Sequence, residues 1–170
     1  VSLPQALGVL NRMQAATGGQ VEAFEFMPRS YSERLAVVRP DLGLPFAVVP
    51  EVTVLIEAAT TVAEEAVAGA DGAVPLVARL EAVLGAMLDE GLITDAVVAR
   101  NEAQRRVMWA RREAAAEIVV GLSPVVDTDV CLPVDRVATF LERAEARLAR
   151  LAALDPGFRS LTVAHLGDGN

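Results

Sequence analysis

The chain has 170 residues, of which 53% are hydrophobic and 4% aromatic, and its formal net charge is −8. This length and apolar content suit one compact domain or two small lobes, with a core built mainly from Ala, Val and Leu. The acidic balance argues against nucleic acid as a partner, because neutralising phosphates requires a basic face.

The chain carries few signs of a membrane or secreted setting. Its most apolar stretch, residues 42–54, contains two prolines and a glutamate and is shorter than the roughly 20 residues that a spanning helix needs. The single cysteine, Cys131, excludes an internal disulfide and suits a reducing compartment. We therefore expect a cytoplasmic protein, with peripheral attachment to the inner membrane as an alternative. All fifteen basic residues are arginine, which we interpret as the codon bias of a high-GC bacterial genome.

Hydrophobic spacing and Gly and Pro positions predict helices and strands in alternation. In chain order they are a helix over residues 3–16, a strand over 20–27, a helix over 29–38, a strand over 51–58, a helix over 76–88, a strand over 93–99, a helix over 101–119, a strand over 125–132, a helix over 137–151 and a strand over 158–164. Gly91 is expected to end the third helix, and Asn101 with Gln104 to form a capping box at the start of the fourth.

Such alternation is often found in doubly wound parallel sheets. Several of these strands, however, keep Glu, Asp or Thr at alternate positions, which is typical of a sheet with one covered face. The sequence therefore predicts an α+β fold, with helices packed on one face of an antiparallel sheet. Two similar αβ lobes are an alternative.

A polar segment with two glycines, HLGDGN at residues 165–170, follows the last predicted strand. His165 could act as a general base or bind a metal, and Asn170 can both donate and accept hydrogen bonds. Asp-Gly is also common in tight turns, and spacing alone favours a polar turn without a ligand.

A second segment places Trp109 beside Arg111 and Arg112 in the helix predicted over residues 101–119. Arginine suits the bidentate binding of a carboxylate. The alternative is a core tryptophan flanked by surface arginines, with Glu113 as a local ion-pair partner. Asp127 and Asp129, two apart on a predicted strand, are interpreted as solvated at a sheet edge.

Five segments, in this order, resemble the C-terminal domain of FAD-linked oxidases of the vanillyl-alcohol-oxidase type. This family includes D-lactate dehydrogenases, glycolate oxidase subunits and D-2-hydroxyglutarate dehydrogenases. The segments are AFEFMPRS at residues 23–30, VLIEAAT at 54–60, NEAQRRVMWARRE at 101–113, TDVCLPVDR at 128–136 and HLGDGN at 165–170. The last of them matches the start of the family's H-x-G-D-G-N-x-H signature.

The resemblance implies a ferredoxin-like α+β fold, with duplication of the unit as an alternative. It identifies residues 1–170 as a truncated C-terminal substrate-binding domain, with FAD held mainly by a separate N-terminal domain. The implied reaction is oxidation of a D-2-hydroxy acid (D-lactate, D-2-hydroxyglutarate or glycolate) to the 2-oxo acid by hydride transfer to flavin. The implied enzyme is an FAD-dependent 2-hydroxy-acid dehydrogenase, of which this fragment alone is expected to be inactive.

The resemblance also implies roles for individual residues. Arg112 matches the arginine of the family's W-x-x-R-E pattern, which binds the substrate carboxylate. His165 matches the first histidine of the signature, a catalytic position that helps to bind Zn²⁺ or another divalent cation, and Asn170 would line the same pocket. Ala116 and Asp127 replace a threonine and a lysine of the D-2-hydroxyglutarate branch, which favours a smaller or different hydroxy acid.

The main alternative is a free-standing α+β module that binds a ligand or regulates without catalysis. A purely structural assembly domain is a third interpretation, and a homodimer is one further expectation. The residues do not indicate the electron acceptor.

Overall fold

The computed structural model describes residues 3–70, 72–119, 122 and 124–166. Its elements, in chain order, are α1 (Leu3–Thr17), β1 (Val21–Pro28), α2 (Arg29–Val38), the 3₁₀ helix η1 (Pro40–Leu42), β2 (Val52–Ala58), α3 (Ala63–Ala66), α4 (Pro75–Asp89), α5 (Glu102–Glu113), α6 (Ala115–Ile118), α7 (Val134–Leu154) and β3 (Ala164–His165).

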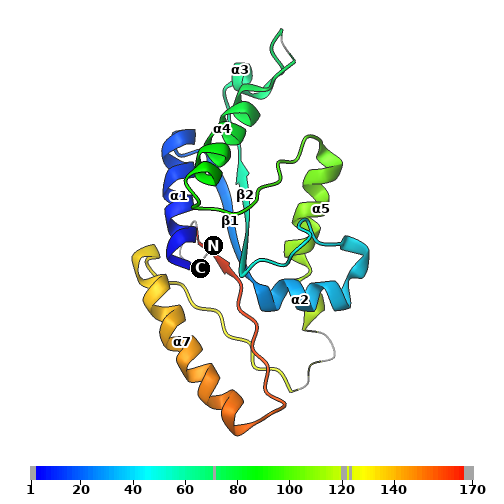
Figure 1. Ribbon diagram of the computed structural model, residues 1–170, viewed down its shortest axis with the longest axis vertical. Coiled ribbons are helices and arrows are strands. Elements are labelled where there is room, and N and C mark those ends of the chain that lie inside the picture. Colours follow the sequence, from blue (N-terminus) through cyan, green and yellow to red (C-terminus); the bar gives the residue numbers. More distant parts are fainter. Residues whose placement is uncertain (1–2, 71, 120–121, 123, 167–170) are drawn as a thin grey trace.

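The strands form an antiparallel sheet in the order β2-β1-β3, with β1 in the centre (Figure 1). Phe24 lies opposite Ile56 on β2, and Glu25 lies opposite His165 on β3. The predicted α+β class with an antiparallel sheet is therefore confirmed. This register brings the first predicted strand next to the last one.

Side chains of β1 alternate between two hydrophobic clusters. Phe24 and Phe26 enter the larger cluster, to which α1, α4 and α7 contribute. Met27 enters the smaller one, with residues of α2 and α6. Figure 1 agrees, with α1 and α4 on one side of β1 and β2, and α2 and α5 on the other. The helices therefore cover both faces of the sheet, whereas the sequence predicted helices on one face only.

Local signals end or begin several elements as expected. Gly91 follows α4 with φ 70°, and the Leu92 amide donates to the Met87 carbonyl, closing the helix C-terminus. The Asn101 side chain accepts from the Gln104 amide at 2.9 Å and caps α5. The Gln104 side chain accepts from the amide of Arg100, one residue before the cap, so the predicted box is closed one position early.

Two predicted strands are wrong. Residues 93–99 and 125–132 contain no strand, and of residues 158–164 only Ala164 belongs to β3. Ile93 packs on the larger cluster as part of an irregular segment, and Val125 and Val126 are exposed. β-branched residues favour strands only where a neighbouring strand and a packed face are present, and neither segment pairs with the sheet. The helix predicted over 101–119 is interrupted at Ala114, between α5 and α6.

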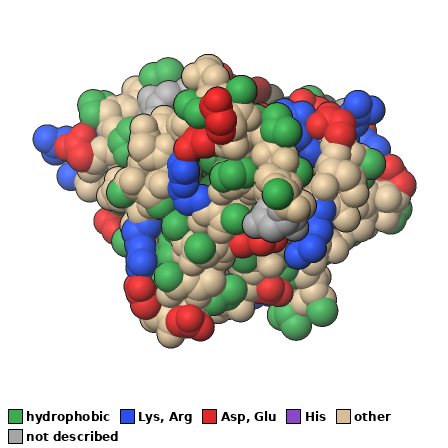
Figure 2. Space-filling view, turned by 90° about the horizontal axis from the view of Figure 1, so that it is seen from above, with side chains coloured by type: hydrophobic (Ala, Val, Ile, Leu, Met, Phe, Trp, Pro, Cys, Tyr) green, Lys and Arg blue, Asp and Glu red, His purple; other side chains and the backbone are tan. Residues whose placement is uncertain are grey.

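Basic and acidic side chains lie next to each other on the face shown in Figure 2. Most ion pairs of the described residues have at least one well-exposed partner, for example Arg39 with Asp41 and Glu117. Pairs of this kind contribute about 0–1 kcal/mol each. Among the described helices, none is both long and apolar enough to cross a membrane.

Candidate functional site

Glu25, Arg112 and His165 form one hydrogen-bonded cluster where β1 and β3 meet α5. The Arg112 Nε–H group donates to Glu25 Oε2 at 2.8 Å. His165 Nδ1 lies 2.6 Å from Glu25 Oε1, and His165 Nε2 lies 3.3 Å from Arg112 Nη2. Arg112 and His165, which the sequence predicted for the site, are thus brought together by Glu25, which it did not predict.

Burial differs sharply across this cluster. The side chains of Glu25 and Arg112 are 3% and 10% exposed, whereas that of His165 is 47% exposed. Charges taken out of water are tolerated only when they are paired and hydrogen-bonded, as these two are. The cluster therefore combines the buried ion pair of Glu25 and Arg112 with the imidazole of His165, which a ligand can reach.

The sheet positions Glu25 and His165. They are partners in the β1–β3 register, and the Leu166 amide donates to the Phe24 carbonyl at 2.9 Å beside them. Leu166 itself is fully buried in the larger cluster, which fixes the chain just after His165.

Tyr31 positions Arg112 from α2. Its hydroxyl lies 2.7 Å from the Arg111 carbonyl oxygen and 2.9 Å from that of Arg112, and so donates to the last turn of α5. Burial raises the pKa of Tyr31 to about 12, so the hydroxyl keeps its proton at neutral pH. Carbonyl groups at a helix C-terminus lack helical partners, and this hydroxyl supplies one.

Glu25 could have been found from the sequence. It stands between Phe24 and Phe26 in a strand that is buried from Phe24 to Met27. A carboxylate among apolar residues of a central strand is rarely buried without a cationic partner. The sequence predicts only a strand here, over residues 20–27. Asn170, the other predicted site residue, lies outside the described residues.

The described residues do not fit the predicted divalent-cation site. Within them, no group of three or more His, Cys, Asp or Glu side chains could hold a metal ion. Both Glu25 oxygens are engaged, and His165 Nε2 faces the guanidinium of Arg112, whose charge opposes a cation. A metal-binding role for His165 stays a prediction.

Trp109 belongs to a separate ion-pair cluster. Its indole N–H donates to Glu57 on β2, and Arg105 donates to both Glu57 oxygens at 2.8 and 3.0 Å. The Arg105 hydrogen bonds hold the pKa of Glu57 below its usual range. Arg111 donates to the carbonyl groups of Leu42 and Gly43, and so anchors η1 and the turn after it. The neighbouring residues Arg111 and Arg112 therefore make different contacts: Arg111 binds backbone carbonyl groups, and Arg112 binds Glu25.

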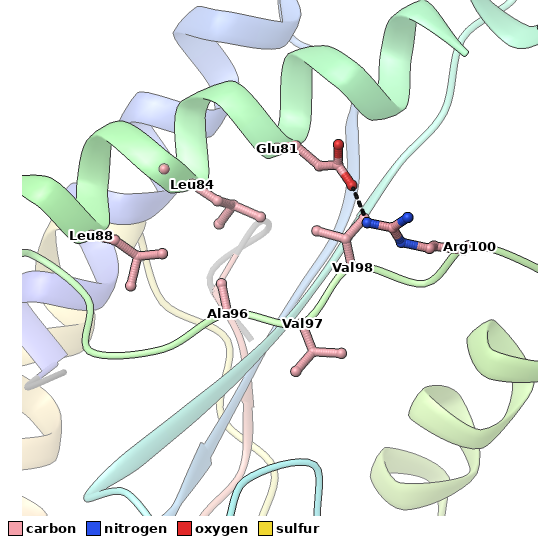
Figure 3. Close-up of a pocket in the computed structure, with 8 residues that line it drawn as sticks. Glu81, Leu84, Leu88, Ala96, Val97, Val98 and Arg100 are labelled. Atoms are coloured by element: carbon pink, nitrogen blue, oxygen red, sulfur yellow. Dashed lines mark hydrogen bonds and ion pairs between the residues drawn. The ribbon is translucent and has the colours of Figure 1, made fainter. Parts of the chain in front are cut away.

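Two hollows have linings that do not include the Glu25 cluster. The larger, of about 910 Å³, is lined mostly by apolar side chains of β2 and residues 44–50 and 93–99, together with Trp109 and Arg111. The smaller, of about 400 Å³, lies between α4 and residues 96–100, where Leu84 and Leu88 face Ala96 beside the exposed Glu81–Arg100 pair (Figure 3). Glu25, Arg112 and His165 are not among the described residues that line either hollow.

Comparison with known proteins points to one family. The model of the family described as FAD linked oxidases, C-terminal domain, matches residues 2–170. The D-2-hydroxyglutarate dehydrogenase of Bos taurus mitochondria is 31% identical over 167 residues, which are 98% of this chain and 27% of that protein. One of the same name from Xanthomonas citri pv. viticola is 28% identical over 173 residues, covering 100% of this chain and 33% of that protein.

A mitochondrial protein of Schizosaccharomyces pombe, provisionally named a D-lactate dehydrogenase, is 32% identical over 98 residues. That match covers 54% of this chain and 19% of the yeast protein. The chain therefore spans about a quarter to a third of the length of the relatives that match nearly all of it.

Proposed function

Because this chain belongs to the family of C-terminal domains of FAD linked oxidases, we propose that it is the substrate-binding part of an FAD-dependent dehydrogenase. Its full-length protein would oxidise a D-2-hydroxy acid to the 2-oxo acid. Residues 1–170 would form the substrate-binding domain, and FAD would be held mainly by a separate domain.

One observation carries the proposal: Arg112 and His165, which come from distant segments of the sequence, meet at Glu25 within hydrogen-bond distances. A 2-hydroxy acid presents a carboxylate and a hydroxyl on adjacent carbons. Binding and oxidising it requires a cation for the first group and a proton acceptor for the second. A guanidinium beside an exposed imidazole supplies both.

The contacts of Arg112 and His165 suggest a different role for each residue. The Nε–H group of Arg112 donates to Glu25, and Nη2 lies 3.3 Å from His165 Nε2, so the N–H groups of Nη1 and the second N–H of Nη2 are those that would hold the carboxylate. The exposed ring of His165 would take the hydroxyl proton as the C–O bond gains double-bond character. When bound, FAD would supply the acceptor for the hydride from C2, and so the oxidant for this two-electron oxidation.

The described residues fit the substrate side of such a site. The buried Glu25–Arg112 pair offers a fixed cation, and the half-exposed imidazole leaves room for a small acid to approach. None of the described residues is assigned to FAD itself. A cytoplasmic location stays a prediction, and two of the relatives above are named as mitochondrial.

The substrate is proposed as a class. The names of the relatives favour D-2-hydroxyglutarate or D-lactate. Ala116 and Asp127, which replace a threonine and a lysine of the D-2-hydroxyglutarate branch, favour a smaller or different acid. Initial rates of dye reduction by the full-length protein, with D-lactate, D-2-hydroxyglutarate, glycolate and the L enantiomers, test this class. Turnover of one D acid or of glycolate supports it, and turnover of none of these acids contradicts it.

A further inference from the structure

We propose that helix α2 sets the affinity of this site for its acid by holding Arg112 in place. Tyr31 and Arg34, one helical turn apart on α2, would act as positioning residues that fix the carbonyl ends of α5 and α6, on either side of the break at Ala114. This inference rests on the proposed function, because the position of Arg112 matters to KM only if its guanidinium binds the carboxylate of the acid.

Helix α5, which carries Arg112, has no fully buried apolar side chain. Arg112 is its one buried residue, and Met108 and Trp109 are half-buried. Most helices in proteins are held by the packing of an apolar face. The place of α5 therefore depends strongly on polar contacts. The cluster around Glu57 holds the middle of this helix, and α2 holds the end at which Arg112 lies.

The hydroxyl of Tyr31 closes the end of α5. It lies 2.7 Å from the Arg111 carbonyl oxygen and 2.9 Å from that of Arg112, so the two carbonyl groups share its single proton. Tyr31 is 1% exposed and belongs to the smaller cluster, together with Ala114 and Ile118. The backbone of the residue that carries the guanidinium is therefore bound to a side chain that packing keeps in place.

Arg34 binds the end of α6 in the same way. Its Nε–H group donates to the Ile118 carbonyl at 3.0 Å, where this four-residue helix ends. Residues three apart lie on the same side of a helix, so Tyr31 and Arg34 face the two helix ends together. The helices cannot swing about the break at Ala114 without losing a hydrogen bond to α2, and Arg112 lies two residues before that break.

Arg111 makes a contact in the opposite direction, from α5 to the segment after α2. Its Nε–H group donates to the carbonyl groups of Leu42 and Gly43 at 3.2 and 3.1 Å. Figure 1 shows α2 and α5 on the same side of the strands. Arg112 is thus fixed through its own carbonyl group and through the residue before it. A side chain that is ordered before binding loses less freedom when the acid arrives, which favours affinity.

The test uses steady-state kinetics of the full-length protein with a hydroxy acid that it turns over. Tyr31→Phe removes the shared hydrogen bond with little change in shape, and Arg34→Met removes the donor to α6. Each should raise KM by about 3- to 10-fold and change kcat by less than about twofold, because the carboxylate is held equally in the bound acid and in the transition state. A merely structural role would lower the amount of active flavoprotein and leave KM unchanged.

The sharpest comparison repeats Tyr31→Phe in an Arg112→Lys background. A flexible ammonium depends little on a fixed backbone, so Tyr31→Phe should raise KM by less than about twofold there. Arg29→Met is the matched control. This arginine also belongs to α2, but its partner is the exposed carboxylate of Glu51, and its loss should leave KM unchanged. Arg34→Lys, which keeps a donor, should retain more affinity than Arg34→Met.

An equal rise of KM from Tyr31→Phe in both backgrounds overturns the inference, because the tyrosine would then act independently of Arg112. An unchanged KM in folded Tyr31→Phe or Arg34→Met protein overturns it as well, while turnover by the unaltered protein still supports the proposed function. If the unaltered protein turns over no hydroxy acid, the proposed function is contradicted, and this inference with it.

Discussion

Glu25 and His165 lie 140 positions apart in the sequence, yet they face each other across the β1–β3 pair with Nδ1 2.6 Å from Oε1. The first strand and the last described strand are thus neighbours, and Arg112 reaches them from α5. The site therefore depends on the sheet as a whole, and changes far from His165 in sequence should alter its chemistry.

Replacing Arg112 by lysine should lower kcat/KM of the full-length protein by about 10- to 100-fold. A lysine keeps the charge but has no planar fork, so it cannot hold both Glu25 and a substrate carboxylate. Steady-state kinetics measure the loss. Arg105→Lys changes a similar pair outside the site and should leave kcat/KM within about twofold. Equal losses in the two variants would sink the assignment of Arg112.

Replacing Glu25 by alanine should destabilise the protein by about 3–5 kcal/mol. The change leaves the guanidinium of Arg112, which is 10% exposed, without its buried partner. Glu57→Ala breaks a pair whose members are 25% and 47% exposed and should cost about 1 kcal/mol or less. Urea unfolding of both variants compares the two losses, and a larger loss for Glu57→Ala would contradict this ranking.

Two glycines of the α4 region should respond to alanine in opposite directions. Gly91 has φ 70°, so Gly91→Ala should destabilise the protein by about 1 kcal/mol through backbone strain alone, since nothing lies within 4 Å of the added Cβ. Gly85 is helical with equally open surroundings, so Gly85→Ala should stabilise it by about 0.5–1 kcal/mol. Thermal unfolding gives both signs, and a stabilising Gly91→Ala would be the contrary result.

Tyr31 should make stability fall in alkaline solution. Burial raises its pKa from 10.0 to about 12, so the folded protein keeps a proton that the unfolded chain loses. This contribution is fully present below pH 10 and is lost as the pH rises to about 12. Tyr31→Phe should cost about 1 kcal/mol at neutral pH through the lost hydrogen bond. Urea unfolding measured over this pH range should show a smaller loss of stability in Tyr31→Phe than in the unaltered protein. The same dependence of stability on pH in both proteins would contradict this prediction.

The local parts of this fold could be predicted from the sequence. The runs around Phe24 and Leu55 lie in the central strand and its neighbour, where apolar side chains and backbone pairing agree. The segments 93–99 and 125–132 have similar composition, but no strand lies beside them. Their conformation depends on packing partners elsewhere in the chain, which hydrophobic period alone does not reveal.

The candidate site was predictable only in part, for a similar reason. Arg112 and His165 stood out by motif, but the sequence does not reveal that both bond to one carboxylate. That information lies in the β1–β3 register and in the Tyr31 contact that holds the end of α5. A Glu between two Phe residues was the available signal: it asks for a cationic partner, but with fifteen arginines in the chain it does not say which one.

The most direct test of the central claim is the visible spectrum of the full-length protein during anaerobic addition of D-lactate, D-2-hydroxyglutarate and glycolate, each in turn. We expect the absorbance of oxidised flavin to bleach with one of these acids in the unaltered protein, and far more slowly in Arg112→Lys. A well-folded full-length protein that contains no flavin, or whose flavin bleaches with none of the acids, would contradict the account.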